Sequence, residues 1–424
     1  MKDRIAHSVF WMFWSRGGVQ SLAFLATLFV ARLLSPGDYG LMAIASIWIG
    51  AIELLAEMGL GAAVVQFRDL NEDELNACFW VTMTIACAGY GTLFVAAPAI
   101  REWFSAPAML VPVLRAAGLT LPITAFRVVP DGLLRKELKL DKISQAEIAG
   151  SLATMPVTVG LAATGAGVWA LVGGALTLPV VQTAVTFVFA RWRPAFRVNS
   201  PRFSAIVHYS IASLGTRIGW SLLGQTDELV LGKVGGHIVL GFYSMAMRLA
   251  LLPVSKITVV ANQLVVPIMA ELQSDVRRMR NSFLRGLRMV ACLTVPLCVG
   301  TALVAPDLIP TMLTAKWTPI VPILQILAAF ALARSIGALL PPVYYARYRV
   351  TSLLRWTTGQ LIVMPIVFLI GAWRWGAYGV AAGWALVYPV VMALMMREVI
   401  HELEITWKEI WDQVRPLVIA VAVM

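Results

Sequence analysis

The sequence predicts an all-α integral membrane protein with about twelve transmembrane helices and the start of a thirteenth, from its composition, the length of its apolar runs and an internal repeat. Of 424 residues, 59% are hydrophobic and only 13% are charged, whereas roughly 25% of an average soluble domain is charged. The runs are too long and too evenly apolar for barrel strands, and a lipid-exposed backbone must satisfy its own hydrogen bonds. This composition excludes a cytosolic catalytic module.

Short polar or Gly/Pro-containing joints separate apolar runs that are each long enough to cross a bilayer, which takes about 20 residues. The expected spans are 9–34, 40–66, 76–99, 109–134, 143–164, 167–190, 206–231, 238–270, 283–305, 319–346, 351–373 and 376–396.

Two segments follow the last of these spans. Residues 398–416 place apolar side chains at steps of three and four among acidic and basic ones, which predicts an amphipathic helix on the inner membrane surface. Residues 417–424 are apolar again but only about 12 Å long as a helix. We therefore expect them to be the start of a further helix that the end of the sequence cuts.

The basic residues predict the orientation of the chain. With the N-terminus inside, the inner joints carry most of the 34 Lys and Arg residues. The cations of the outer joints are Arg32, Arg101, Lys233, Lys316 and Arg374. The positive-inside rule then places the N-terminus in the cytoplasm. Because membrane orientation accounts for the excess of basic residues, the net charge of +11 does not indicate nucleic-acid binding, and we expect no nucleic-acid partner.

An internal repeat relates the two halves of the chain. At one spacing Arg16 aligns with Arg217. At a slightly larger spacing, the run GGALTLPVV at 173–181 aligns with GWALVYPVV at 383–391. Shared composition explains stray Leu and Val matches, but it explains a paired intramembrane arginine and a repeated proline register poorly. We interpret the pattern as a duplication.

The duplication predicts two six-helix bundles. An even number of helices in each copy gives both the same orientation, so a pseudo-two-fold axis along the membrane normal should relate them, as in transporters that work by alternating access. The expected parts are a first bundle at 1–190, a cytoplasmic linker at 191–205, a second bundle at 206–397, the amphipathic helix at 398–416 and the truncated helix at 417–424.

Each cation inside a predicted span raises the free energy of membrane insertion by about 2.5 to 3.5 kcal/mol on insertion scales. They should therefore face a bundle interior or a wet cavity, and their excess over acids predicts an anionic cargo. Arg248 and Arg334 fall near mid-membrane, whereas snorkelling to the interface explains Arg16, Arg217 and Arg115 equally well. The predicted cationic set is Arg248, Arg334, Arg16, Arg217, Arg127, Arg115 and Lys256.

Acids inside the spans are the candidates for an ion pair or an ion-coupling site. Glu53 and Glu57 are four residues apart on one helix face, and Asp227 and Glu228 lie near the outer end of the seventh span. They could pair with an arginine or bind a proton or a sodium ion. We expect no other cofactor and no metal site. The sequence contains no GxxxxGK[ST], HExxH or GxSxG motif, so we do not expect an enzyme.

Two stretches carry a family resemblance. The first is ARLLSPGDYGL at 31–41, followed by EMGLGAAVVQ at 57–66; the second is DELVLGKVGG at 227–236, followed by LGFYSMAMRLALLP at 240–253. Together with the span pattern, they resemble the Wzx-like polysaccharide and O-antigen flippases of the multidrug/oligosaccharidyl-lipid/polysaccharide (MOP) exporter superfamily. Members of this family often carry fourteen helices, which agrees with truncation here.

This resemblance implies that the protein moves an undecaprenyl-diphosphate-linked oligosaccharide across the bacterial inner membrane, for exopolysaccharide, capsule or O-antigen assembly. It implies membrane lipids, a polysaccharide polymerase and export machinery as partners. A lipid diphosphate is an anion, so this function agrees with the predicted cationic cavity.

Two other functions stay open. A drug or cation antiporter of the same superfamily should carry more acids and fewer arginines in its cavity. A non-transporting membrane subunit of a polysaccharide synthase has little reason to keep arginines inside its spans.

Overall fold

The computed structural model describes residues 22–57, 60–67, 70–196 and 203–422, and over this part of the chain every regular element is a helix. Ten of the described helices are long and apolar enough to cross a membrane, and Leu22–Leu33 forms a shorter apolar helix. The all-α membrane fold is thus confirmed. The number of twelve spans stays a prediction, because the spans expected at 9–34 and 206–231 include residues whose side chains are not described.

The chain forms two compact units. The first unit consists of the chain up to Gln225 together with the short segment Gly236–Ile238. The second unit consists of Thr226–Gly235 and the residues from Val239 onward. The linker expected at 191–205 lies within the first unit, and 197–202 are outside the described residues. The domain bounds derived from the sequence therefore stay a prediction.

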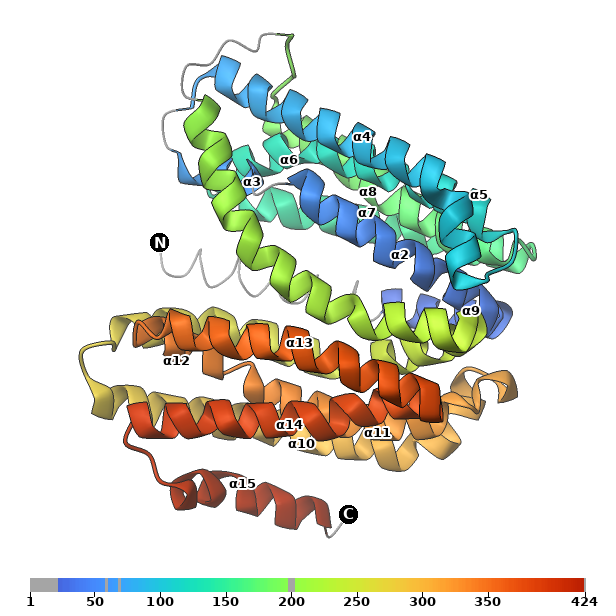
Figure 1. Ribbon diagram of the computed structural model, residues 1–424. Helices are drawn as coiled ribbons and strands as arrows, with labels where there is room; N and C mark the ends of the chain where they lie inside the picture. Colours follow the sequence, from blue (N-terminus) through green and yellow to red (C-terminus); the bar gives the residue numbers. More distant parts are fainter. Residues whose placement is uncertain (1–21, 58–59, 68–69, 197–202, 423–424) are drawn as a thin grey trace. The chain divides into compact units, whose positions relative to one another are not determined.

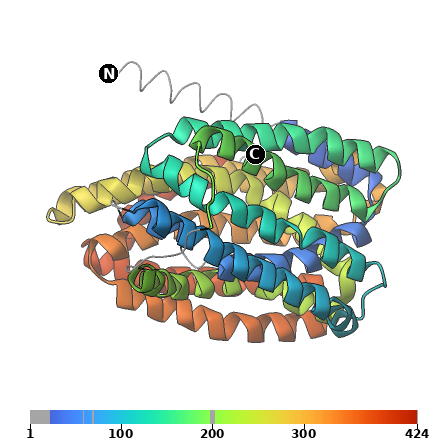
Figure 2. The ribbon, with the colours of Figure 1, turned by 90° about the horizontal axis from the view of Figure 1, so that it is seen from above.

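The first unit is a bundle of helices that run alongside one another (Figures 1 and 2). In it α4 packs on α6, and α8 packs on both α6 and α7. Asn71 and Glu74 begin α4 with a reciprocal capping box, in which each side chain accepts a hydrogen bond from the other residue's backbone N–H at 2.8 and 3.0 Å. Its helices are α2 (Pro36–Glu57), α3 (Leu60–Gln66), α4 (Glu72–Phe104), α5 (Leu110–Ala117), α6 (Thr120–Lys136), α7 (Leu140–Ala163) and α8 (Val168–Ala190).

The second unit begins within the kinked helix α9 (Phe203–Glu271). Gly236 interrupts α9 with φ 78°, a conformation that a residue without a Cβ adopts without strain. The helices that follow are α10 (Val276–Met312), the short 3-10 helix η1 (Ala315–Trp317), α11 (Ile320–Gly337), α12 (Leu340–Ala346), α13 (Val350–Trp375), α14 (Ala377–Glu402) and α15 (Trp407–Ala422). Within this unit α14 packs on α11 and α13, and α15 packs on α10.

The backbone repeats between the two units. Leu138, between α6 and α7, has φ 56°, and Tyr348, between α12 and α13, has φ 55°. Gly167 precedes α8 with φ 58°, and Gly376 precedes α14 with φ 59°. A left-handed φ is uncommon for Leu and Tyr, so its recurrence at corresponding joints supports the duplication.

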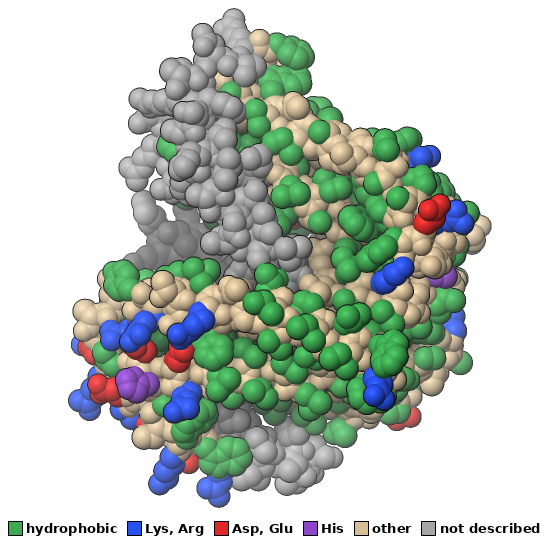
Figure 3. Space-filling view, viewed as in Figure 1, with side chains coloured by type: hydrophobic (Ala, Val, Ile, Leu, Met, Phe, Trp, Pro, Cys, Tyr) green, Lys and Arg blue, Asp and Glu red, His purple; other side chains and the backbone are tan. Residues whose placement is uncertain are grey.

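The surface of the second unit suits a bilayer. Figure 3 shows apolar side chains covering the middle of α13 and α14, while charged side chains gather at the α12 end. Ile362, Ile366 and Leu386 are among the large apolar residues exposed on these two helices. Outward-facing apolar side chains at this density are typical of a lipid-facing surface.

The end of the chain differs from the sequence prediction of one amphipathic helix at 398–416. Helix α14 runs on through Glu402, Glu404 turns the chain with φ 52°, and α15 begins at Trp407. Thr406 and Glu409 set this start, because the Glu409 carboxylate accepts hydrogen bonds from the Thr406 backbone N–H and hydroxyl, both at 2.9 Å. Helix α15 continues through Pro416 to Ala422, so no new helix begins at 417.

Candidate functional site

Three of the predicted site residues cannot be placed at side-chain level. Arg16 lies outside the described residues, Arg217 lies on the helical backbone of α9 without a described side chain, and the same is true of Glu57 on α2. Glu53 is half-buried on α2. The role predicted for the Glu53 and Glu57 pair therefore stays a prediction.

Three of the predicted cations have exposed side chains in the second unit. Arg248 and Lys256 lie on α9, and Arg334 lies on α11. The Arg334 guanidinium is 5.8 Å from the centre of the Phe330 ring, close enough for a cation–π contact.

The other two described cations are engaged by neighbours in the first unit. Arg127 Nε lies 3.5 Å from Asp131 Oδ2 one turn further along α6, and Arg127 also donates to Gln182 on α8. Arg115 Nε donates to the Phe94 carbonyl at 3.3 Å, and its guanidinium lies 4.1 Å from the centre of the Phe94 ring. Both arginines therefore join helices within the bundle, and a role in binding stays a prediction for them.

Asp227 is the centre of a polar contact in the second unit that the sequence reasoning did not anticipate. Only 2% of Asp227 is exposed. Its Oδ2 accepts hydrogen bonds from the Tyr243 hydroxyl at 2.6 Å and from the Trp384 indole N–H at 2.8 Å. Its Oδ1 is buried with no hydrogen-bond partner. A buried charge without full pairing is costly.

An aromatic cluster surrounds Trp384 and extends from Asp227 to Arg334. The Trp384 ring stacks on the Phe330 ring of α11, with ring centres 4.6 Å apart. The centre of the Phe368 ring, on α13, lies 5.0 Å from the centre of the Trp384 ring. Phe330 is also the ring that Arg334 approaches. Aromatic side chains therefore connect the buried acid to an exposed cation through contacts within one unit.

A second cluster that was not predicted from the sequence lies at the α12 end of the second unit. It includes Arg347, Arg349 and Arg355, which belong to the inner-joint cations that predict the orientation of the chain. The structure brings these arginines together with Glu398 and Glu402 around a cavity. The signal in the sequence is the i,i+4 spacing of the two glutamates, which puts both on one face of α14.

Solved structures of similar fold define the class to which this architecture belongs. The lipid II flippase MurJ in an inward closed conformation aligns with a TM-score of 0.79 and 15% identity, covering 98% of this chain and 92% of MurJ. An inward-facing multidrug resistance MATE family transporter of the MOP superfamily aligns with a TM-score of 0.71 and 18% identity, covering 91% of this chain and 95% of the transporter. The protein has the fold of the MOP superfamily.

The family follows from the sequence match. Residues 29–322 match the family of polysaccharide biosynthesis proteins, and the chain belongs to this family. The lipopolysaccharide biosynthesis protein WzxC of Escherichia coli K12 is 25% identical over 376 residues, 84% of this chain and 73% of WzxC. The succinoglycan biosynthesis transport protein ExoT of Rhizobium meliloti is 23% identical over 324 residues, 76% of this chain and 65% of ExoT. The Wzx-like resemblance is thereby confirmed.

Proposed function

We propose that this protein moves a lipid-linked oligosaccharide from the cytoplasmic to the periplasmic leaflet of the bacterial inner membrane, for polysaccharide assembly, with its N-terminus in the cytoplasm. The observation that carries the proposal is the family match over residues 29–322 on a fold that MurJ, a lipid II flippase, shares. The relatives WzxC and ExoT are named for polysaccharide biosynthesis and transport. The charge distribution supports the orientation through the positive-inside rule.

The exposed cations support an anionic cargo. A polyprenyl carrier joined to its sugar by a diphosphate presents two phosphates, and guanidinium groups bind phosphate oxygens through paired charge-assisted hydrogen bonds. Arg248 and Arg334 provide such groups on α9 and α11, with Lys256 as a further point charge. We infer that these side chains hold the undecaprenyl diphosphate while the lipid tail stays in the bilayer, and that the protein alternates between inward and outward access.

Asp227 is the residue we propose for coupling, and a proton is favoured over a sodium ion. Both groups that contact Oδ2 are donors, and the Trp384 indole can only donate. A sodium ion needs several oxygen acceptors around it, which a donor-lined carboxyl does not provide. Oδ1 is buried and has no hydrogen-bond partner, so a proton bound there would displace no existing contact. Protonation would relieve the buried charge without displacing either donor.

Reconstitution in vesicles tests the transport itself. The purified protein is placed in vesicles that carry a lipid-linked oligosaccharide, and a lectin or glycosidase added outside measures the sugar that becomes accessible. We expect accessibility to rise with the protein and not in vesicles without it. No rise, with the protein correctly inserted, would contradict flipping, while export of a cationic drug from the same vesicles would favour the antiporter function.

A further inference from the structure

A cavity of about 580 Å³ lies within the second unit, where α12, the turn between α12 and α13, and the end of α14 meet. This volume lies in the range of small-molecule sites, about 300 to 1,000 Å³. Its charged lining is Arg347, Arg349, Arg355, Arg397, Glu398 and Glu402. In Figure 3 the charged side chains gather at this end of α13 and α14.

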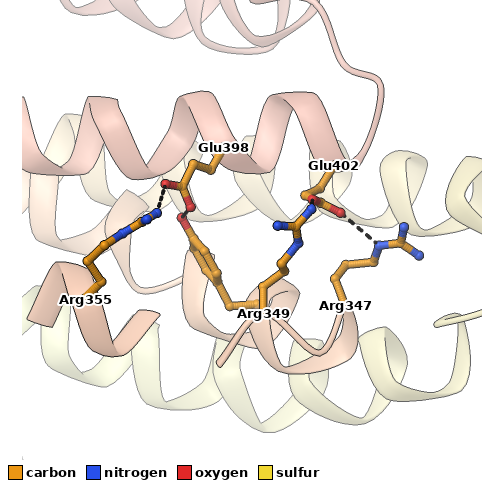
Figure 4. Close-up of polar contacts among 6 residues, drawn as sticks. Arg347, Arg349, Arg355, Glu398 and Glu402 are labelled. Carbon is orange, nitrogen blue, oxygen red and sulfur yellow. Dashed lines mark hydrogen bonds and ion pairs between the residues drawn. The ribbon is translucent and has the colours of Figure 1, made fainter. Parts of the chain in front are cut away.

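Both acids of the cavity are already paired. Glu398 Oε1 lies 3.1 Å from Arg355 Nη2, while Glu402 lies 3.4 Å from Arg347 Nε and 2.5 Å from Arg349 Nη2 (Figure 4). The Tyr344 hydroxyl also donates to Glu398, at 3.1 Å. These contacts hold the acids in place and use most of their acceptor capacity.

Arg397 is left without an acid. Its side chain is exposed on α14 and lines the cavity, and no ion pair joins it to any acid in the part of the chain that the structure describes. The lining therefore has four arginines for two glutamates. The surplus of positive charge gives the cavity an attraction for anions.

The first unit has the same helical turn without this cluster. The register set by Leu138 with Tyr348, and by Gly167 with Gly376, pairs Arg355 with Gln145 and Glu398 with Phe189. In the first unit Lys142 Nζ lies 4.8 Å from the centre of the Phe189 ring. The turn therefore folds without counterparts of Arg355 and Glu398, which favours a binding role for these two over a purely structural one. Arg347 and Arg349 correspond to Glu137 and Lys139, which form an ion pair in the first unit.

We propose that this cavity binds the phosphate headgroup of an anionic bilayer lipid, at a site separate from the transported cargo. Arginine forks match phosphate oxygens in geometry, and basic pockets between transmembrane helices at a membrane surface bind such headgroups. Trp356 and Leu394 add apolar walls. The neighbouring Leu354 is an exposed apolar residue on α13, so the acyl chains can continue along the surface of the unit. Free phosphate shares this chemistry and is the alternative source of the ligand.

Native mass spectrometry of the full chain, with phosphatidylglycerol added in mild detergent, measures the binding. Arg397→Ala removes the unpaired charge and leaves all three ion pairs, so its thermal unfolding should match that of the wild type. We expect it to lower the bound phosphatidylglycerol about tenfold, the loss of one hydrogen bond to a charged group. The matched control is Arg374→Ala, which removes an exposed cation at the far end of α13 and should leave binding unchanged.

Three results would overturn the proposal. One is equal retention of phosphatidylglycerol by the wild type, Arg397→Ala and Arg374→Ala. Another is displacement of the lipid by millimolar inorganic phosphate, and the third is equal binding of phosphatidylcholine, a zwitterion of zero net charge. Either of these last two would remove the anionic lipid as the preferred ligand. If Arg397→Ala unfolds, Arg397→Lys serves instead: it keeps the charge but not the fork, and should bind less than the wild type. The measurement reads bound lipid and is independent of flipping.

Discussion

The indole N–H of Trp384 on α14 donates to Asp227 Oδ2 on α9 at 2.8 Å, across 157 residues of sequence. Tyr243 donates to the same oxygen from the helical segment that follows the Gly236 kink. Three helical segments of the second unit therefore meet at one buried carboxyl. A change in the charge of Asp227 would alter the strength of both hydrogen bonds to its Oδ2. Asp227 is therefore well placed to couple protonation to a helix movement.

Asp227→Asn should abolish the effect of an imposed pH gradient on transport. Asparagine can still accept from Tyr243 and Trp384, but it cannot exchange a proton. Vesicle transport with and without a gradient measures this. Tyr243→Phe is the control: it leaves the carboxyl ionisable, so gradient dependence should persist, with a loss of about 1 kcal/mol of stability from one hydrogen bond. Full gradient dependence in Asp227→Asn would refute the coupling role.

Arg248→Ala and Arg334→Ala should each lower the rate of flipping at least about tenfold, since each removes a charged hydrogen-bond donor to the cargo. Because both side chains are exposed, expression and thermal unfolding should stay near those of the wild type. Polymer export in a strain that lacks the native protein is the measurement. Arg374→Ala, another exposed arginine of the second unit, should export normally. Normal export by both Arg248→Ala and Arg334→Ala at native expression would refute the hypothesis that these arginines bind the cargo.

Gly379→Ala should destabilise the protein by about 1 to 3 kcal/mol or more, through overpacking. A Cβ at Gly379 would lie 2.1 Å from the Gly371 carbonyl oxygen, so α13 and α14 would have to move apart. Gly359→Ala is the matched control on α13, because its Cβ meets nothing within 4 Å. Thermal unfolding in detergent should show a lower midpoint for the first variant only. Equal midpoints would mean that the two helices are not in backbone contact.

Arg127→Ala should cost about 1 to 3 kcal/mol, because it leaves Asp131 without its charged partner inside the bundle. Asp131 is only 20% exposed, and Thr186 approaches it at 3.5 Å. Arg127→Ala combined with Asp131→Asn should recover part of the loss, since the orphaned charge is then gone. Thermal unfolding of the single and double variants measures the coupling. No recovery in the double variant would argue against the ion pair.

The attachment of α15 should weaken in acid. Hydrogen bonds from the Thr406 backbone N–H, from Arg280 and from the Thr406 hydroxyl lower the pKa of Glu409 to about 2, from 4.5. Because the folded-state pKa is depressed, the stabilisation is complete above pH 4.5 and is lost as the pH falls toward 2. The protection of the α15 amides, which compares their exchange rate with that of the unfolded chain at the same pH, should therefore fall below pH 4.5. Glu409→Gln should already have low protection at neutral pH and show no further fall over this range.

The all-helical membrane fold could be predicted from the sequence because it depends on local quantities. Run length, mean hydropathy and the distribution of Lys and Arg decide whether a segment crosses a bilayer. The predicted spans at 143–164 and 351–373 correspond to α7 and α13. The capping signal of Thr406 and Glu409 was also present in the sequence, although the amphipathic periodicity around it obscured the start of α15.

Pairing between distant side chains could not be predicted. Arg127 was expected to be a cavity cation, but in the structure Asp131 and Gln182 engage it. The i,i+4 spacing to Asp131 was visible, whereas the contact with Gln182 on another helix was not. Arg347, Arg349 and Arg355 were interpreted as orienting charges, since their acidic partners lie about fifty positions away.

The sequence by itself determined that this is a multi-pass helical protein with a duplicated architecture and a Wzx-like character. The hydrophobicity and charge of a segment decide whether that segment crosses the bilayer, so membrane spans can be predicted one segment at a time. Only the tertiary structure decided which charges are exposed, which are paired and which are buried. Those states depend on the neighbours that packing brings together, as Trp384 and Tyr243 do at Asp227, and no spacing in the sequence encodes them.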